Sequence, residues 1–155
     1  MRPGQRGFSY LEMIAAASLM MILASAIMPL ARVTRTRQRE MELRRELRTL
    51  RTAIDRYKAS VDAGMIGGTD VKLGSEGYPP DLETLVEGVS QVGKLDTKLK
   101  FLRRIPKDPM TGKDEWGMRC YQDEPDEDSW CGQNVYDVFS KSTGEGLDGT
   151  KYKEW

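Results

Sequence analysis

The sequence contains no histidine, and this absence excludes catalytic triads with an imidazole base and metal sites with imidazole ligands. It also lacks the phosphate-binding glycine loop of nucleotide-dependent enzymes, because its glycine-rich stretches flank turns. Asp126 and Asp128 are carboxylates of the type used for acid–base chemistry, but they lie in an acidic run that indicates no pocket. The sequence therefore predicts a protein that is not an enzyme.

Cysteine is scarce as well, since Cys120 and Cys131 are the only two in 155 residues. Their spacing is compatible with a local disulfide, which would contribute about 3 kcal/mol by closing a loop of roughly a dozen residues. Such a bond persists in the periplasm but not in a reducing cytosol. Two reduced thiols in the core are the alternative. The stretch between them, DEPDEDSWC, is too polar to be core.

Charge is nearly absent from residues 8–31, where Glu12 is the only charged side chain. As a helix, this run would extend roughly 36 Å, which is enough to cross a hydrocarbon core of about 30 Å. An ionised carboxylate near the bilayer centre costs about 2.5 to 3.5 kcal/mol, so it usually has a partner or a function. We therefore predict a membrane-spanning segment in which Glu12 either pairs with a cation or reaches the interface from one turn inside.

The segment before this run, MRPGQRG, has two arginines and no apolar core, so it does not indicate a secretory signal of the usual form. Cleavage after Gly7 would free the amine of Phe8 and leave the whole apolar segment attached. The product would carry a cation at its N-terminus and the anion of Glu12 one turn later.

The motif RGFSYLEMI resembles the processing site of type IV prepilins and type II secretion pseudopilins. In that family a membrane aspartyl peptidase cleaves after the glycine and methylates the new amine. The resemblance implies cleavage between Gly7 and Phe8, methylation of Phe8, and an assembly role for Glu12. Pro29 lies where many members have a helix-kinking proline, although it could instead end a helix near the membrane surface. Met21 stands near the position of the helix glycine common in pilins.

Beyond the apolar run, a helical repeat of apolar residues predicts that the helix continues through residues 32–63 as an amphipathic half. On its polar side, Glu40 and Arg44 are spaced as an i,i+4 ion pair. Glycines at 64, 67 and 68 would end the helix. The apolar face predicts packing on the domain that follows, with a dimeric coiled coil as the alternative. This face consists of Leu43, Leu47, Leu50, Ile54, Tyr57 and Val61.

The remainder of the chain predicts a small α+β domain. Residues 64–100 are turn-rich, and Asp81 could cap a short helix. The segment FLRRIPKDPMTGKDEW resembles a part of the major pseudopilin that leads into a small sheet, with Met110 where an aromatic is usual. Strands are expected over 116–121 and 134–140. The expected fold is pilin-like, with a long N-terminal helix packed on a small antiparallel sheet.

The tail, SKSTGEGLDGTKYKEW, resembles the C-terminal loop that binds calcium in many major pseudopilins. Calcium takes six to eight oxygen ligands. The resemblance implies a calcium site that includes Glu145 and Asp148, whereas a plain turn at Asp148 and Gly149 is the alternative. The loop is shorter than the usual one.

Charge is unevenly distributed although the net charge is zero. Residues 32–58 contain ten basic and four acidic side chains, and residues 106–155 contain six basic and twelve acidic ones. This polarity could attract subunits to one another or bring the arginines to anionic lipid, and it is equally compatible with solvated surfaces. Nucleic-acid binding is not expected, because the basic stretch has one aromatic, Tyr57, and is interleaved with acids.

The arginines also create a conflict over topology. Arg2 and Arg6 precede the apolar run and eight arginines follow within twenty residues, so the positive-inside rule alone would place the domain in the cytoplasm. The resemblance to prepilins implies the reverse, with the leader in the cytoplasm, a single pass through the bacterial inner membrane, and the domain in the periplasm.

The resemblance also implies a domain organisation and a function. It predicts a structural subunit that polymerises with copies of itself into a periplasmic pseudopilus and drives export through the type II secretion system. Its expected partners are prepilin peptidase, minor pseudopilins, the inner-membrane assembly platform and, before assembly, membrane lipid. A type IV pilin for adhesion, motility or DNA uptake is one alternative, and a bitopic membrane protein that binds a partner without polymerising is another. The expected segments are a leader at 1–7, a transmembrane helix at 8–31, its amphipathic continuation at 32–63, and a periplasmic domain at 64–155.

Overall fold

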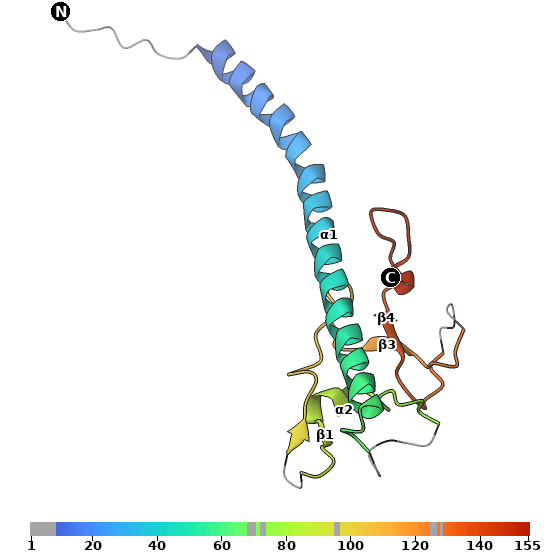
Figure 1. The fold of residues 1–155 in the computed structure, drawn as a ribbon. Helices are drawn as coiled ribbons and strands as arrows, with labels where there is room; N and C mark the ends of the chain where they lie inside the picture. Colours follow the sequence, from blue (N-terminus) through green and yellow to red (C-terminus); the bar gives the residue numbers. More distant parts are fainter. Residues whose placement is uncertain (1–8, 68–70, 72–73, 95–96, 125–126, 128) are drawn as a thin grey trace, which may run out of the picture. The chain divides into compact units, whose positions relative to one another are not determined.

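The computed structural model describes residues 9–67, 71, 74–94, 97–124, 127 and 129–155, without the side chains of residues 26–30. The chain divides into two units, Met1–Gln38 and Arg39–Trp155. Helix α1 (Tyr10–Asp62) contributes to both units (Figure 1). The fold is mixed α and β, with this long N-terminal helix and two small antiparallel sheets.

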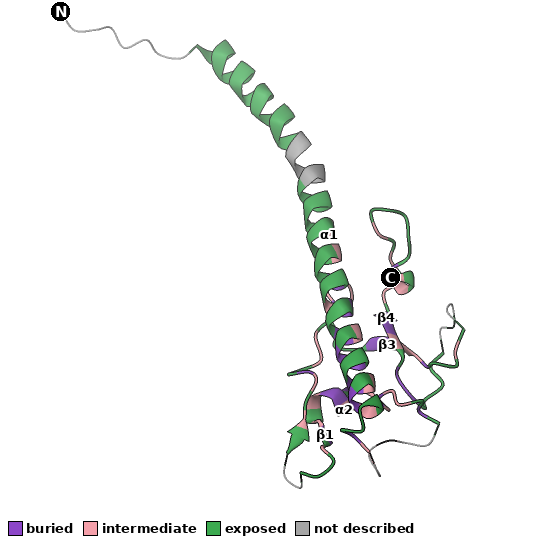
Figure 2. Ribbon diagram, in the orientation of Figure 1, coloured by how far each residue is buried: buried purple, intermediate pink, exposed green. Residues whose placement is uncertain are grey.

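In the first unit, α1 begins where the amides of Glu12 and Met13 donate hydrogen bonds to the carbonyl of Ser9, at 3.0 and 3.1 Å. Apolar side chains follow without a covering layer, and Figure 2 shows this part of the helix as exposed. Tyr10, for example, is 81% exposed and Leu23 is 66% exposed. Across the residues that the structure describes, no helix has a stretch apolar and long enough to cross a membrane.

In the second unit, the apolar face of α1 forms the centre of a hydrophobic core. Five of the six residues predicted for this face are at most 2% exposed, and the sixth, Val61, packs partly buried against them. Side chains from the short helix, the strands and the C-terminal segment complete the core, which confirms that the face packs on its own domain. The five buried residues are Leu43, Leu47, Leu50, Ile54 and Tyr57.

The end of α1 follows the predicted glycine signal. The amide of Gly64 donates to the carbonyl of Val61 at 2.9 Å, and the amide of Met65 donates to the carbonyl of Ser60 at 2.9 Å. Gly64 has a φ of 68°, the left-handed conformation that this pair of bonds requires and that glycine adopts without a Cβ clash. The helix therefore stops at Asp62, and Gly68 lies outside the described residues.

Helix α2 (Leu82–Glu87) is the short helix that Asp81 was expected to cap. The Asp81 carboxylate accepts hydrogen bonds from the Thr84 amide at 2.8 Å and from the Thr84 hydroxyl at 2.6 Å. Leu82 and Leu85 are buried, so α2 adds to the core through one face. The amide of Gly88 then donates to the carbonyl of Thr84 and closes the helix.

The strands form two sheets of two strands each, rather than the single small sheet expected. Strand β1 (Val89–Ser90) pairs antiparallel with β2 (Lys98–Leu99), and β3 (Trp116–Arg119) pairs antiparallel with β4 (Asp137–Ser140). The first pair was not expected, because two-residue strands are too short to show an alternating pattern. Strands β3 and β4 lie within the ranges 116–121 and 134–140 where strands were expected, and each strand is shorter than its expected range.

Burial does not alternate strictly along the strand expected at 134–140. Val138 and Phe139 are adjacent yet both buried. Val138 joins the core, while the Phe139 ring packs over Gly117 of the paired strand and beneath the Arg119 guanidinium, 4.2 Å from its centroid. Both faces of β4 are therefore covered, which a strand with one solvent face would not show.

Candidate functional site

Glu12 lies in the first turn of α1, at the N-terminal end of the helix. This position favours a negative charge because the helix dipole is positive at this end. The described side chains next to it, such as Leu11 and Met13, are exposed and apolar, so the carboxylate lies on an apolar helix surface. The predicted cleavage site at Gly7 and Phe8 lies outside the described residues, as does the side chain of Pro29.

The serines of this surface have their hydroxyl groups satisfied within the helix. Ser18 donates to the carbonyl of Ile14 at 2.8 Å, and Ser25 donates to the carbonyl of Ile22 at 2.7 Å. A hydroxyl that bonds its own helix can enter an apolar environment without losing a partner. The surface from Tyr10 to Ser25 therefore suits contact with lipid or with other apolar helices.

Cys120 and Cys131 are joined by a disulfide with their Cα atoms 6.0 Å apart. Cys120 is buried directly after β3, and its amide donates to the Asp123 carboxylate at 2.7 Å. The Asn134 side chain accepts from the amide of Tyr121 at 3.0 Å and so fastens the far end of the loop to its start. The bond closes the acidic loop as a structural unit.

The C-terminal loop is fastened to α1 by polar contacts that involve Glu40. One carboxylate oxygen of Glu40 accepts from the amide of Leu147 at 2.7 Å and from the hydroxyl of Tyr152 at 3.2 Å. Burial raises the pKa of Tyr152, and the charge of Glu40 raises it further. Glu40 was expected to pair with Arg44 on the solvent side, but both side chains instead contact this loop.

Arg44 of α1 makes a second attachment to the C-terminal loop, in addition to that of Glu40. Its guanidinium donates to the Asp148 carboxylate at 3.1 Å and lies over the Trp155 ring, 4.0 Å from the centroid. The Asp148 carboxylate also accepts from the hydroxyl of Thr150 at 2.6 Å and from its amide at 3.0 Å. These hydrogen bonds from Thr150, together with the charge of Arg44, lower the pKa of Asp148.

Arg51 makes the third attachment, and it is the most extensive. It binds both carboxylate oxygens of Asp137 on β4, at 2.6 and 3.2 Å. It also donates to the carbonyls of Val138 and Trp155, at 3.2 and 2.7 Å. A single guanidinium thus links α1, the sheet and the C-terminal segment, since its planar group offers several donors in fixed directions.

The structure brings Glu145 and Asp148 into one loop but does not assemble a group of oxygen ligands around them. Asp148 already uses one carboxylate oxygen for Thr150 and the other for Arg44. Among the described residues, the one set of three side chains with metal-ligand spacing is Cys120, Asp123 and Cys131, whose sulfur atoms are in the disulfide. Calcium at Glu145 and Asp148 stays a prediction.

Asp108 is a structural carboxylate whose role was not identified from the sequence. It is fully buried, accepts from the Met110 amide at 2.8 Å, and accepts from the hydroxyl of Ser140 on β4 at 2.6 Å. The prolines at 106 and 109, on either side of Asp108, are a local sequence signal for a turn at this site. No sequence signal indicated that Asp108 would contact Ser140, which lies thirty-two residues later in the chain.

A cavity of about 620 Å³ lies between α1 and the C-terminal loop, and its walls include Arg44, Arg51, Asp148 and Trp155. These side chains already bind one another, so the cavity is the space left where the C-terminal loop attaches to α1, and it does not by itself indicate a ligand site. Comparisons of the chain with family models, curated proteins and solved structures find no match. The chemistry of the chain's own surfaces is therefore the basis for a function.

Proposed function

We propose that this protein is a structural subunit that polymerises into a pseudopilus of the type II secretion system. The observation that carries the proposal is Glu12, a lone carboxylate in the first turn of an exposed apolar helix. A helix surface of this kind needs a cover, because large exposed apolar patches on soluble proteins mark contacts with membranes or other proteins. Membrane lipid would cover it before assembly, and the helices of neighbouring subunits would cover it afterwards.

The pairing of Glu12 with an N-terminal amine gives the assembly a mechanism. Cleavage after Gly7 would create a cation on Phe8, and in a low-dielectric bundle of helices this cation attracts the carboxylate of a neighbour far more strongly than in water. A buried ion pair of this kind is costly to break by removing one partner. The register between successive subunits would then be set by one charge pair at the start of each helix.

Two features of the second unit support a secretion pseudopilus in the periplasm. The Cys120–Cys131 disulfide suits an oxidising compartment, which agrees with a single pass that leaves the leader in the cytoplasm. The turn built on buried Asp108 lies in the segment that resembles the major pseudopilin. No catalytic role is proposed for the protein, whose partners would be copies of itself, prepilin peptidase, minor pseudopilins and the assembly platform.

N-terminal mass analysis of the membrane-extracted protein tests this proposal. The expected mature chain begins at methylated Phe8, and a Gly7→Val variant should keep its leader because it removes the glycine after which the peptidase of the resembled family cleaves. A chain that retains Met1 in a host with active prepilin peptidase would overturn the proposal. Fibres on the cell surface at ordinary expression levels would instead favour a type IV pilus.

A further inference from the structure

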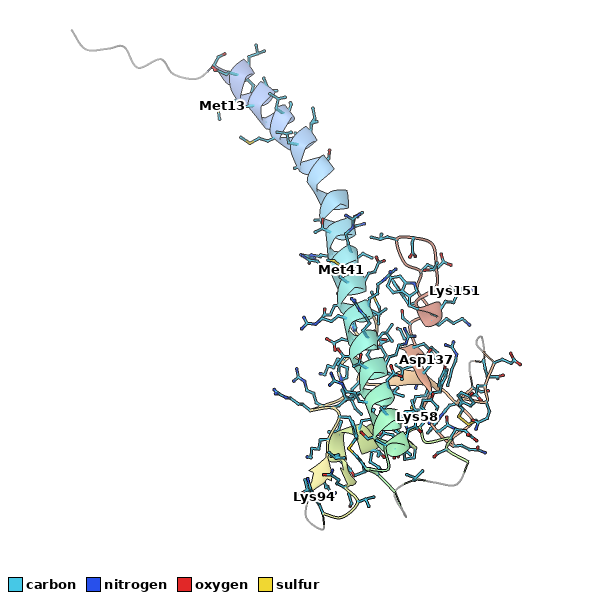
Figure 3. The ribbon with its side chains drawn as sticks, viewed as in Figure 1. Met13, Met41, Lys58, Lys94, Asp137 and Lys151 are labelled. Atoms are coloured by element: carbon cyan, nitrogen blue, oxygen red, sulfur yellow. A yellow bond between two sulfur atoms is a disulfide. The ribbon has the colours of Figure 1, made fainter. Side chains whose placement is uncertain are left out.

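The outward face of α1 in the second unit carries arginines on the side opposite the buried stripe. Arg45, Arg48 and Arg56 are exposed, whereas Leu43, Leu47 and the other stripe residues are buried. Figure 3 shows nitrogen-tipped side chains beside α1 on the side away from Asp137 and Lys151. We call Arg45, Arg48 and Arg56 the arginine face.

The arginine face borders a groove of about 340 Å³ whose floor includes Phe101 and Leu102. Arg48 donates to the carbonyl of Arg44 at 3.2 Å. Within the described part of the chain, neither Arg45 nor Arg56 belongs to an ion pair. The groove therefore combines an apolar floor with guanidinium groups that are available to a partner.

A second surface of the same unit carries aromatic and acidic side chains in place of arginines. Tyr78, Tyr121 and Tyr136 form a triangle of rings with centroids 5.2 to 5.8 Å apart. Tyr121 is 55% exposed and Tyr136 is 47% exposed. The adjoining disulfide loop adds exposed carboxylates at Glu124 and Glu127. We call these five residues the tyrosine–acid cluster.

The tyrosine–acid cluster has the chemistry to bind cations. The ammonium of Lys58 already lies 5.8 Å from the Tyr78 ring centroid, which occupies one part of the cluster with a cation of the same chain. Tyrosine rings attract guanidinium groups through their faces, and the carboxylates of the disulfide loop, which begins beside Tyr121, can accept charge-assisted hydrogen bonds. Tyrosine and arginine are also enriched among the residues that dominate protein–protein binding energy.

We propose that the arginine face of one copy of this chain binds the tyrosine–acid cluster of a second copy. The inference rests on the proposed polymerisation and names a surface for it outside the apolar helix. Charge complementarity favours a second copy, because every chain supplies both surfaces in equal number. The carboxylates of the cluster would repel an anionic lipid or a nucleic acid from that surface.

The contact uses different surfaces on its two partners, so one bound copy still offers a free arginine face and the other a free tyrosine–acid cluster. Contacts of this heterologous type extend into open filaments when the rotation between subunits does not close a ring. The arginine face and the tyrosine–acid cluster would thus supply a contact that can repeat from one copy to the next. They would act between the domains and in an aqueous environment, where salt weakens them.

Photo-crosslinking of the full-length chain in membranes tests the contact. Benzoylphenylalanine replaces Thr52, which is exposed and lines the groove, and the partner copies carry a heavy isotope label. The expected product joins residue 52 to the heavy tryptic peptide 120–141, which contains both exposed tyrosines. Reversal of charge in Arg45→Glu with Arg56→Glu should lower its yield about tenfold or more. Adding Glu124→Arg and Glu127→Arg to the same chain should restore the crosslink, which would then be found on peptide 120–127 or 128–141 because trypsin also cleaves after position 127 in this variant.

Lys94→Glu with Lys98→Glu is the matched control, because it changes the net charge equally at exposed residues outside both surfaces. Its crosslink yield should equal that of the unaltered chain. Oligomers crosslinked at residue 52 only to peptides outside residues 120–141 would overturn this contact while leaving polymerisation intact. A chain that stays monomeric in membranes would overturn the contact and the proposed function together. Loss of crosslinking without rescue by the fourfold variant would also count against the contact.

Discussion

The packing between β3 and β4 requires a residue without a side chain at position 117, which is Gly117. A Cβ built on this residue would lie 2.3 Å from two ring carbons of Phe139, which is its cross-strand partner. The ring cannot easily withdraw, since the Arg119 guanidinium lies over it at 4.2 Å. Glycine is therefore needed here for close approach, and its backbone conformation is not the reason.

We predict that Gly117→Ala destabilises the domain by about 1 to 3 kcal/mol, the usual cost of overpacking a well-filled site. Urea denaturation of the detergent-solubilised chain, followed by tryptophan fluorescence, would measure the change. Gly67→Ala is the control, because a Cβ there would meet Val92 at an ordinary contact distance of 3.4 Å. Equal stability of the two variants would show that the Phe139 ring moves freely.

Asp148 predicts a pH dependence of the C-terminal loop. Hydrogen bonds from Thr150 and the charge of Arg44 lower its pKa in the folded state. Stabilisation from a lowered carboxyl pKa is present above the unfolded value of about 3.9 and disappears as the pH falls through the folded value. The loop should therefore loosen in acid, below about pH 4, and keep its contacts at neutral pH.

Replacement of the carboxylate tests the same contact at neutral pH. Asp148→Asn keeps an acceptor for Thr150 but loses the charge that pairs with Arg44, so the amides of Gly146 and Thr150 should exchange faster, by less than about fivefold. Hydrogen exchange with mass detection would measure this. Asp114→Asn, at another exposed carboxylate, should leave the loop unchanged.

At the scale of elements, the sequence predicted the features that depend on residues close together in the chain. The buried stripe of α1 follows from its spacing, the start of α2 follows from Asp81, and the end of α1 follows from Gly64. Each of these depends on residues within a few positions of one another. Their sequence patterns therefore carried the information needed.

The side-chain contacts that were missed depend on residues far apart in the chain. Glu40 and Arg44 look like a solvent-exposed pair in the sequence, yet their partners come from a loop more than a hundred residues later. Arg51 likewise binds Asp137 and the carbonyl of Trp155. At the proposed assembly site, the sequence identified Glu12 because an isolated charge in an apolar run is a local signal, whereas it could not identify the arginine face as a groove with Phe101.

The disulfide loop gives a prediction at this scale. Cys120→Ser with Cys131→Ser should cost about 3 kcal/mol or less, since the closed loop is short. The loss should be concentrated in the segment between the cysteines, because Asn134 and Asp123 depend on the loop geometry for their contacts with Tyr121 and Cys120. Thermal unfolding of the oxidised and doubly substituted chains would measure the cost. An unchanged melting temperature would show that the bond is incidental to the fold.

At the scale of the whole molecule, the two units differ in what covers their apolar side chains. In Arg39–Trp155, the stripe of α1 is buried by the chain itself. In the described part of Met1–Gln38, side chains such as Leu11 and Met20 have no cover from the chain. The second unit is thus complete as a folded domain, whereas the first is suited to a surface provided by lipid or by other copies.

Glu12→Ala therefore separates membrane insertion from assembly. Removing the charge should leave insertion intact or favour it, because an ionised carboxylate in a bilayer costs about 2.5 to 3.5 kcal/mol. It should abolish fibres, since the amine of a neighbouring subunit would lose its anion. Carbonate extraction would measure insertion, and electron microscopy of sheared fractions would measure fibres. Glu42→Ala, at an exposed glutamate farther along α1, should assemble normally, and normal fibres from Glu12→Ala would refute the assembly role.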